Sequence, residues 1–525
     1  MTSTPSVLIV GAGFGGLAAA LELKRRGHDA FTIIDKADGL GGVWRDNTYP
    51  GAACDAPSDL YSFSFAPNAY WPKRFAEQRD ILAYMHDVAR RYDLEKHMRF
   101  GVEVDSADFD ADRGRWRVRT ISGELLEADV FVPAVGQLSR PVWPNIPGMD
   151  SFTEDAFHSA RWDHDVELSG KRVAIIGTGA SAIQIIPAIQ PKVGQLTVFQ
   201  RSAPWIIPKI ESCYASPKLD ALDNLSIVAM FPLIQRAERF GWYLFYELVT
   251  SGLEGNGRMA DLISGWADRH RAAQICDPEL LAKMTPDYAA GCKRGLMASN
   301  YYPAVSQPNV HVETSPIAEI MPTGVRTEDG SRSEVDVIVY CTGFKTTEFL
   351  APMTIRGIGG KELREVWSGG ARAYMGLTVP HFPNMFIMYG PNTNLGAGSI
   401  IYMHERQARY LRQAVEHLRG AGDYLSVRPE VEARFDEEIQ GRLEHTVWTK
   451  CASWYREASG RVTTNWPGRM SEYDKRSHFD VRDYELVRTG RAGHDALVIG
   501  SSACAAVDRA GVPGRCAGDR ARLRR

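Results

Sequence analysis

One local pattern occurs twice in this chain, and the repetition limits the folds that the chain can adopt. In each copy a short apolar run rich in β-branched residues leads into closely spaced glycines and then into a helical pattern. The copies read VLIVGAGFGGLAAALEL and KRVAIIGTGASAIQII. This order is typical of a unit that binds a dinucleotide. The sequence therefore predicts an α/β fold with two Rossmann-like dinucleotide-binding domains.

The first copy contains Gly11, Gly13 and Gly16 in the spacing G-x-G-x-x-G, here called the first glycine turn. Its glycines permit a tight turn, backbone approach to a pyrophosphate, and close packing of helix on strand. The next apolar run ends at Asp35, 19 residues after Gly16. An acid at this distance binds the ribose hydroxyls of an adenine dinucleotide. We therefore predict a dinucleotide site, with glycines that serve only a turn as the alternative.

The second copy has Gly177, Gly179 and Ala182 in the related spacing G-x-G-x-x-A, here called the second glycine turn. Ser181 lies inside it and is predicted to contact the cofactor. Arg201 stands 19 residues after Ala182, near the position that the acid takes in the first copy. A guanidinium binds a 2′-phosphate through paired charge-assisted hydrogen bonds, so Arg201 favours NADPH over NADH. A surface arginine at the end of a strand is the alternative.

A long run of unusual residues follows the first copy: GGVWRDNTYPGAACDAPSDLYSFSF. A glycine pair, an aromatic residue and a Tyr-Pro-Gly turn can hold an irregular loop along a bound cofactor, where a helix would be too bulky. For Asp55 alone, a carboxylate that caps a turn would be the ordinary interpretation. In this context we predict cofactor contacts from Gly42, Trp44, Asp55 and Tyr61.

A second motif, F-x-x-x-x-x-H-x-x-x-W-D, lies between the two glycine turns. Its four defined positions are Phe152, His158, Trp162 and Asp163. With G-G-x-W-x-x-x-x-Y-P-G-x-x-x-D, it makes the chain up to about residue 487 resemble the flavin-dependent Baeyer–Villiger monooxygenases. One position departs from the family: its linker motif has glycine where this chain has Glu154, which leaves the local backbone geometry of the linker open.

The resemblance implies an activity and a set of roles. Such enzymes use FAD, NADPH and dioxygen to convert a ketone to an ester or lactone through a peroxyflavin. Arg294 matches the family's essential arginine, which suits this chemistry because a guanidinium stays charged at any working pH. Asp55 would orient Arg294, and Lys293 with Arg201 would bind the NADPH phosphate. Trp454 matches a tryptophan that contacts cofactor and substrate, with an ordinary packed indole as the alternative.

His158 is expected to help position the nicotinamide-binding domain, and an ordinary hydrogen-bonded histidine is the second interpretation.

Strands are expected within 382–394, followed by a helix from 400 to 418. The chain is expected to divide into an FAD-binding domain (1–145 and 341–487), an NADPH-binding domain (146–208 and 291–340), a helical insert (209–290) and a disordered tail (488–525).

Composition excludes several classes of protein. A net charge of −3 with mixed signs gives no surface for nucleic acid. The eight cysteines include no C-x-x-C, which argues against a disulfide framework, a metal site and a dithiol active site, so reduced thiols are expected. Charges interrupt the apolar stretch 225–250, so no membrane span is expected. With no signal peptide at the N-terminus, a cytoplasmic enzyme is expected, and its oligomeric state stays open.

Three other functions are alternatives to Baeyer–Villiger oxidation. An N- or S-oxygenating flavin monooxygenase shares the glycine turns but lacks the long motif that ends at Asp55. A disulfide reductase needs a redox C-x-x-C, which the chain does not have. A flavin- and NADP-binding protein without catalytic activity would have no reason to keep Asp55 and Arg294 together.

Overall fold

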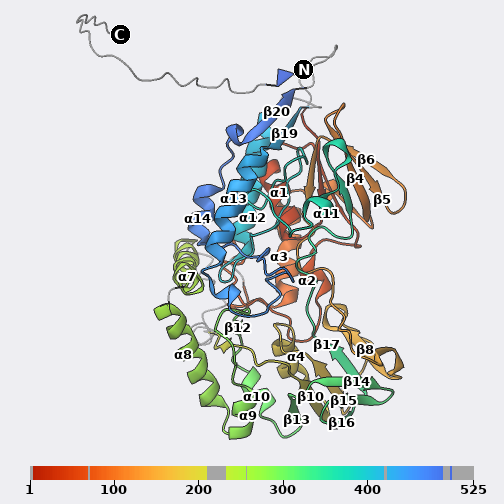
Figure 1. The fold of residues 1–525 in the computed structure, drawn as a ribbon, viewed down its shortest axis with the longest axis vertical. Helices are drawn as coiled ribbons and strands as arrows, with labels where there is room; N and C mark the ends of the chain where they lie inside the picture. Colours follow the sequence, from red (N-terminus) through yellow and green to blue (C-terminus); the bar gives the residue numbers. More distant parts are fainter. Residues whose placement is uncertain are drawn as a thin grey trace, which may run out of the picture.

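The computed structural model describes residues 4–68, 71–209, 232–255, 257–418, 423–488 and 497–498 of the 525-residue chain. Figure 1 shows two α/β parts along the long axis of the molecule. Helices α1 and α12 lie in the upper part, and α4 lies with β10 and β17 in the lower part. Each part is built around one parallel sheet.

The upper part contains the first glycine turn. Strand β1 is buried at all four positions and is central in a parallel sheet of order β3-β2-β1-β7. Helix α1 packs along α12, and its small residues Ala18, Ala19 and Ala20 permit a close approach. The strand predicted to end at Asp35 and the helix predicted from 400 are confirmed. The bounds are β1 (Val7–Val10), α1 (Phe14–Arg25), β2 (Phe31–Asp35), β3 (Met98–Phe100), β7 (Val130–Pro133) and α12 (Ile400–His417).

The lower part contains the second glycine turn. Its five parallel strands follow the order β13-β10-β9-β17-β8, and the apolar strands β9 and β17 lie inside the sheet. Helix α4 follows the glycine turn, and α10 packs against it. The bounds are β8 (Asp155–His158), β9 (Arg172–Ile176), α4 (Ala182–Ile189), β10 (Gln195–Phe199), α10 (Tyr301–Val305), β13 (Val310–Glu313) and β17 (Val337–Tyr340).

Part of the linker motif forms a strand of the second sheet. Residues 155–158 form β8, which pairs with β17 in the register His158 to Tyr340. β8 covers the edge of β17, whose four residues are all buried. Glu154 is exposed and does not have a positive φ, so its backbone does not require the glycine of the family motif.

Helices α7, α8 and α9 form the described part of the expected helical insert, while residues 210–231 lie outside the described residues. None of the helices within the described ranges has the length and apolar character needed to cross a membrane. Strands β11 and β12 pair beside the insert. The bounds are β11 (Ile206–Ile207), α7 (Pro232–Leu253), α8 (Gly257–Gln274), α9 (Pro278–Lys283) and β12 (Leu296–Met297).

Two further sheets and several helices complete the two parts. β18-β4-β5-β6 form a four-stranded sheet around the fully buried Trp116, and β14-β15-β16 form an antiparallel sheet. The bounds are α2 (Val43–Asp46), α3 (Gln78–Arg91), β4 (Val104–Asp110), β5 (Arg115–Thr120), β6 (Leu125–Ala128), β14 (Ile317–Met321), β15 (Gly324–Thr327), β16 (Arg332–Glu334), β18 (Thr354–Arg356), α11 (Leu363–Val366), α13 (Pro429–Leu443) and α14 (Met470–Arg476).

Two late segments differ from their sequence-based interpretation. Residues 382–394 form no regular strand, because Asn384, Tyr389 and Asn392 have a positive φ that an extended strand cannot contain. In the tail, β21 (Leu497–Val498) pairs with β20 (Tyr484–Arg488), which also pairs with β19 (Tyr424–Val427). The rest of the tail that was expected to be disordered lies outside the described residues.

Candidate active site

A cavity of about 400 Å³ connects the two α/β parts. The first glycine turn and the GGVW segment line it on one side, and Ala180 and Ser181 beside the second glycine turn line it on the other. Nine of the predicted site residues line this cavity: Gly11, Gly13, Asp35, Gly42, Trp44, Asp55, Tyr61, Ser181 and Arg294. The remaining cofactor residues Gly16, Gly177, Gly179, Arg201, Lys293 and Trp454 lie outside its lining.

The first glycine turn is a tight cradle that side chains would fill. Gly11 has a φ of +114°, and a Cβ atom there would lie 2.5 Å from the carbonyl oxygen of Ala134. A Cβ atom at Gly16 would overlap the carbonyl oxygen of Gly11. Because glycine has no Cβ atom, helix α1 can pack against the turn. Gly42 has a φ of +54°, and a Cβ atom there would lie 3.1 Å from the Cα atom of Gly13. These glycines let backbone N–H groups approach a pyrophosphate, so the cradle fits FAD.

Asp35 is held in place by backbone donors. Its Oδ2 accepts a hydrogen bond from the N–H of Ala12 at 2.7 Å, and its Oδ1 accepts one from Ala37 at 2.9 Å. Arg45 lies 3.8 Å from the same carboxylate. The Asp35 carboxylate thus bridges the end of β2 and the first glycine turn, at the position where a ribose is expected.

Trp44 and Tyr61 form a second fixed edge of the cavity. The indole N–H of Trp44 donates to the hydroxyl of Tyr61 at 3.1 Å, and the rings meet edge to face at 5.8 Å. Tyr61 also contacts Phe14 of α1 edge to face. The GGVW motif and the Tyr61 position are therefore coupled through packing to the first glycine turn.

Arg294 and Asp55 form a charge pair inside the cavity. The Nη2 of Arg294 donates to Oδ1 of Asp55 at 2.8 Å and to Oδ2 at 2.6 Å, and its Nε donates to Oδ2 at 3.2 Å. Burial alone would raise the pKa of Asp55, but the charge and hydrogen bonds of Arg294 hold this pKa below its usual value. Asp55 in turn raises the pKa of Arg294. The pair is therefore ionised, and the Arg294 side chain is 36% exposed.

The loop that carries Asp55 docks onto helix α4 of the lower part. The side-chain amide of Gln184 donates to the carbonyl oxygen of Ala53 at 2.9 Å, and its oxygen accepts from the hydroxyl of Tyr49 at 3.1 Å. Gly51 has a φ of +82°, and a Cβ atom there would lie 2.6 Å from the carbonyl oxygen of Gln184. The Tyr-Pro-Gly turn therefore fits against α4, which brings Asp55 to the domain boundary.

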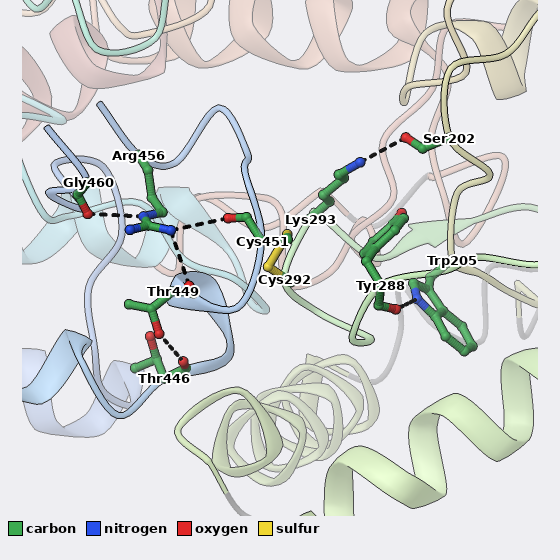
Figure 2. The surroundings of a disulfide bond; sticks show 10 residues. All are labelled: Ser202, Trp205, Tyr288, Cys292, Lys293, Thr446, Thr449, Cys451, Arg456 and Gly460. Carbon is green, nitrogen blue, oxygen red and sulfur yellow. Dashed lines mark hydrogen bonds between the residues drawn. A yellow bond between two sulfur atoms is a disulfide. The ribbon is translucent and has the colours of Figure 1, made fainter. Parts of the chain in front are cut away.

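Lys293, unlike Arg294, bonds to a residue that follows β10. Its Nζ donates to Oγ of Ser202 at 2.8 Å (Figure 2). Burial and the nearby positive charge of Arg201 lower the pKa of Lys293. Arg201 is exposed. Two cations and a hydroxyl at the end of one strand are suited to a phosphate group.

Trp454 lies in a loop outside the lining of the cavity. The Oγ1 of Thr346 donates to its carbonyl oxygen at 2.9 Å, and its ring lies 4.1 Å from that of Tyr455. Tyr455 is buried, and Trp454 packs against the core of the upper part. These contacts agree with a packed indole as well as with a residue at the edge of a substrate site.

The linker motif forms a packed corner beside the second sheet. His158 is fully buried, burial lowers its pKa to about 4, and its Nδ1 accepts from the N–H of Ala160 at 3.0 Å. The ring is therefore neutral at ordinary pH. Trp162 meets Phe157 edge to face at 5.1 Å, and Phe152 packs against the buried apolar cluster that includes Ile176 and Ile338. Asp163 is exposed and accepts a hydrogen bond from the N–H of Asp165.

Comparison with known proteins identifies the family. The profile described as "Flavin-binding monooxygenase-like" matches residues 4–219. A Baeyer–Villiger monooxygenase of Streptomyces coelicolor is 42% identical over 491 residues, which cover 93% of each chain. The structure of an oxidised steroid monooxygenase bound to NADP superimposes with a TM-score of 0.78 at 32% identity, over 90% of this chain and 96% of that one. The chain belongs to the Baeyer–Villiger monooxygenases.

A structure of OTEMO in complex with FAD and NADP also matches this Baeyer–Villiger monooxygenase, with a TM-score of 0.80 at 26% identity, over 93% of this chain and all of that one. The predicted fold class and enzyme class are confirmed. The chain is an oxidoreductase that depends on FAD and NADPH and acts on ketones.

Sequence reasoning missed several residues of this Baeyer–Villiger monooxygenase. Ser202 contacts Lys293 and stands in no motif that the sequence analysis used. Gln184 clamps the Asp55 loop, and it lies in the second copy at a position to which no contact was assigned. Tyr389 and Asn394 line the cavity and are joined by a 2.6 Å hydrogen bond from the tyrosine hydroxyl to the asparagine oxygen. The run GPNTN, rich in residues that favour turns, was the available signal for this last pair.

The expectation of reduced thiols is wrong for one pair of cysteines. Cys292 and Cys451 form a disulfide across a separation of 159 residues (Figure 2). The expectation came from the absence of C-x-x-C, which detects only pairs that are close in sequence. Folding brings the two Cα atoms to 6.0 Å, a distance that a disulfide spans.

Proposed function

We propose that Arg294 is the catalytic cation of this enzyme and that Asp55 holds it in place. The observation that carries the proposal is the two-pronged hydrogen bonding of Arg294 to Asp55 inside the cavity that the first glycine turn lines. When bound, NADPH supplies a hydride, and FAD supplies the group that is reduced and reacts with dioxygen. The role of the chain is to bind these groups, orient them and exclude water.

Arg294 presents a positive charge to the cavity that it lines between the two glycine turns. A guanidinium keeps its charge at any working pH, and Asp55 raises the pKa of Arg294 further. A fixed cation stabilises negative charge that develops during reaction, and it polarises a ketone carbonyl that lies against it. Asp55 uses its oxygens on one edge of the guanidinium, so the remaining N–H groups are oriented before a substrate binds.

The cofactor roles follow from the two different turns. We propose that FAD is held by Gly11, Gly13, Gly16, Gly42 and Asp35, with Trp44 and Tyr61 along its edge. NADPH would lie at the second glycine turn, with Gly177, Gly179 and Ser181 near the pyrophosphate. Arg201, Ser202 and Lys293 would bind its 2′-phosphate, and Trp454 would lie at the edge of the ketone site. The motif that contains His158 would position the nicotinamide-binding domain through packing.

The upper part, residues 1–145 and 341–487, would then be the FAD-binding domain. Residues 146–208 and 291–340 would be the NADPH-binding domain, and 209–290 the helical insert. We propose a ketone and dioxygen as substrates and no nucleic-acid partner, in line with the net charge of −3. The proposed site of action is the cytoplasm, where NADPH would be the available reductant.

Arg294→Ala tests the central role. The variant should keep its FAD, and hydride transfer from NADPH should remain measurable, because that step needs the two rings rather than a stabilised anion. Ester formation should fall by about a hundredfold to a thousandfold, as when one preorganised charge is removed, and NADPH oxidation should release hydrogen peroxide instead. Ester is measured by gas chromatography and peroxide by a coupled assay.

Arg326→Ala is the matched control, because Arg326 forms an exposed ion pair with Glu319 at 3.0 Å in the β14-β15 sheet. It should behave like the parent enzyme in both assays. Ester formation by Arg294→Ala near the parent rate would show that Arg294 is not the catalytic cation.

A further inference from the structure

The Cys292–Cys451 disulfide joins two segments that each carry a residue of the proposed site. Cys292 directly precedes Lys293 and Arg294, and Cys451 lies three residues before Trp454. Cys292 is fully buried, and Cys451 is partly exposed. The bond therefore ties the loop of the proposed catalytic cation to a loop from the far end of the sequence.

The Cys451 segment is a firm support for this tether. Arg456 donates through Nε to the carbonyl oxygen of Gly460 at 3.0 Å, and through Nη1 to those of Thr449 at 3.1 Å and Cys451 at 3.5 Å. Figure 2 shows this guanidinium on one side of the disulfide and the Lys293–Ser202 pair on the other. One arginine thus fixes the backbone on both sides of Cys451.

The Cys292 segment, by contrast, carries two neighbouring cations, Lys293 and Arg294, that contact different parts of the proposed site. Lys293 reaches Ser202 at 2.8 Å, whereas Arg294 reaches Asp55 at 2.6 Å. The preceding Gly291 has a φ of +84° and packs beside Leu253 of α7. A small shift of this backbone would move both cations together.

We propose that the Cys292–Cys451 disulfide is a positioning element for oxygenation, so that coupling of NADPH oxidation to ester formation depends on the redox state of this pair. The inference rests on the role of Arg294 given under Proposed function. The disulfide sets the backbone of Arg294 against the support that Arg456 provides. Disulfides are uncommon in reducing compartments, and those that occur there are often catalytic or redox-sensing.

The switching step is a thiol–disulfide exchange with a dithiol reductant. A thiolate of the dithiol attacks the sulfur of Cys451, the more exposed partner, and Cys292 leaves as a thiolate that takes up a proton. The second thiol of the reductant then releases Cys451 as a thiol. In total, two electrons and two protons convert the disulfide to two thiols, while the dithiol is oxidised to its own disulfide.

The test uses Cys292→Ser, Cys451→Ser, the double variant and the parent enzyme, each with and without dithiothreitol. Alkylation of the folded protein followed by peptide mass spectrometry reports whether the two cysteines are bonded. The second readout is ester formed per NADPH oxidised, with peroxide measured in parallel. Cys276→Ser is the control, because Cys276 is an exposed free cysteine between α8 and α9.

We expect the parent to show a bonded pair and to lose coupling by roughly tenfold on reduction, since displacing a catalytic group by about 1 Å can cost up to a hundredfold in rate. Both single variants and the double variant should show the same loss, and dithiothreitol should not change the double variant further. Cys276→Ser should match the parent and respond to dithiothreitol as the parent does. FAD content should stay at the parent level throughout.

A role in stability alone has a different signature. A disulfide that closes a long loop stabilises a protein by constraining its unfolded state. Variants with a lower melting temperature but the parent ratio of ester to peroxide would therefore overturn the proposal, as would free thiols at both positions in the unreduced parent. If Arg294→Ala loses ester while the cysteine variants keep parent coupling, this inference fails alone. If Arg294→Ala keeps making ester, the proposed function fails.

Discussion

The two glycine turns are built from the same local pattern, yet the structure gives them different surroundings. Gly13 in the first turn has Gly42 beside it, 3.7 Å from where its Cβ atom would be, and Asp35 is buried with both oxygens bonded to backbone N–H groups. Gly179 in the second turn is exposed, with open space where a Cβ atom would be, and Arg201 is exposed as well. The first turn is suited to a cofactor that stays bound, and the second to a cosubstrate that must leave.

The largest expected effect is on the first turn. Gly11→Ala places a Cβ atom 2.5 Å from the Ala134 oxygen at a φ of +114°, so the variant should be purified without flavin or fail to fold. Backbone strain of this kind costs about 1–3 kcal/mol before the steric clash is added. Flavin absorbance per mole of protein and the melting temperature measure the effect.

Gly177, the counterpart of Gly11, is packed as tightly, since a Cβ atom there would lie 2.5 Å from the carbonyl oxygen of Cys341. The variant that probes the exposed side of the second turn is Gly179→Ala, which adds its methyl group to open space. Its stability should stay within about 0.5 kcal/mol of the parent, and its flavin content should not change. Equal loss of flavin from both variants would show that the two turns do not differ as described.

A smaller effect is expected from Asp35→Ala. This change leaves the N–H groups of Ala12 and Ala37 without their acceptor and removes the proposed partner of the ribose. Each buried donor left without an acceptor costs about 1–3 kcal/mol, so the dissociation constant of FAD should rise by roughly a hundredfold. Titration of apoprotein by flavin fluorescence measures it. Asp35→Asn keeps one acceptor and should lose less affinity.

Arg201→Ala should act on the other cofactor only. Loss of a charged hydrogen bond to the 2′-phosphate should remove about 1.5–3 kcal/mol of the transition-state stabilisation that kcat/KM for NADPH measures, mostly through a higher KM. The values for NADH and the flavin content should remain near those of the parent. Equal use of NADPH and NADH by the parent enzyme would contradict the assignment of the second turn.

The smallest effect concerns pH. Because burial and Arg201 lower the pKa of Lys293 from 10.5, its charge is lost at a lower pH than that of an ordinary lysine. The KM for NADPH should therefore rise with pH at values below 10.5, while the KM for NADH should not. Lys293→Arg keeps its charge and should remove the rise. A rise that persists in this variant would assign the titration to another group.

Some of the site could be read from the sequence because it is written in short-range spacing. Gly11, Asp35 and Gly42 each belong to a motif in which neighbouring residues supply the strand, turn and helix. Ser202 and Gln184 could not be found in this way, because their partners Lys293 and Ala53 lie far along the chain. Residues 382–394 were misread for a related reason: apolar residues there are buried in loops with positive φ, where the alternation of a strand does not apply.

The sequence by itself determined the two dinucleotide-binding units, the family motifs and the residue types that could carry charge into a flavin site. These features depend on local spacing, since a glycine turn is formed by residues next to one another. Only the tertiary structure decided that β8 completes the second sheet, that α4 clamps the Asp55 loop, and that Cys292 meets Cys451. Such contacts join residues far apart in the chain, and they exist only once the chain has folded.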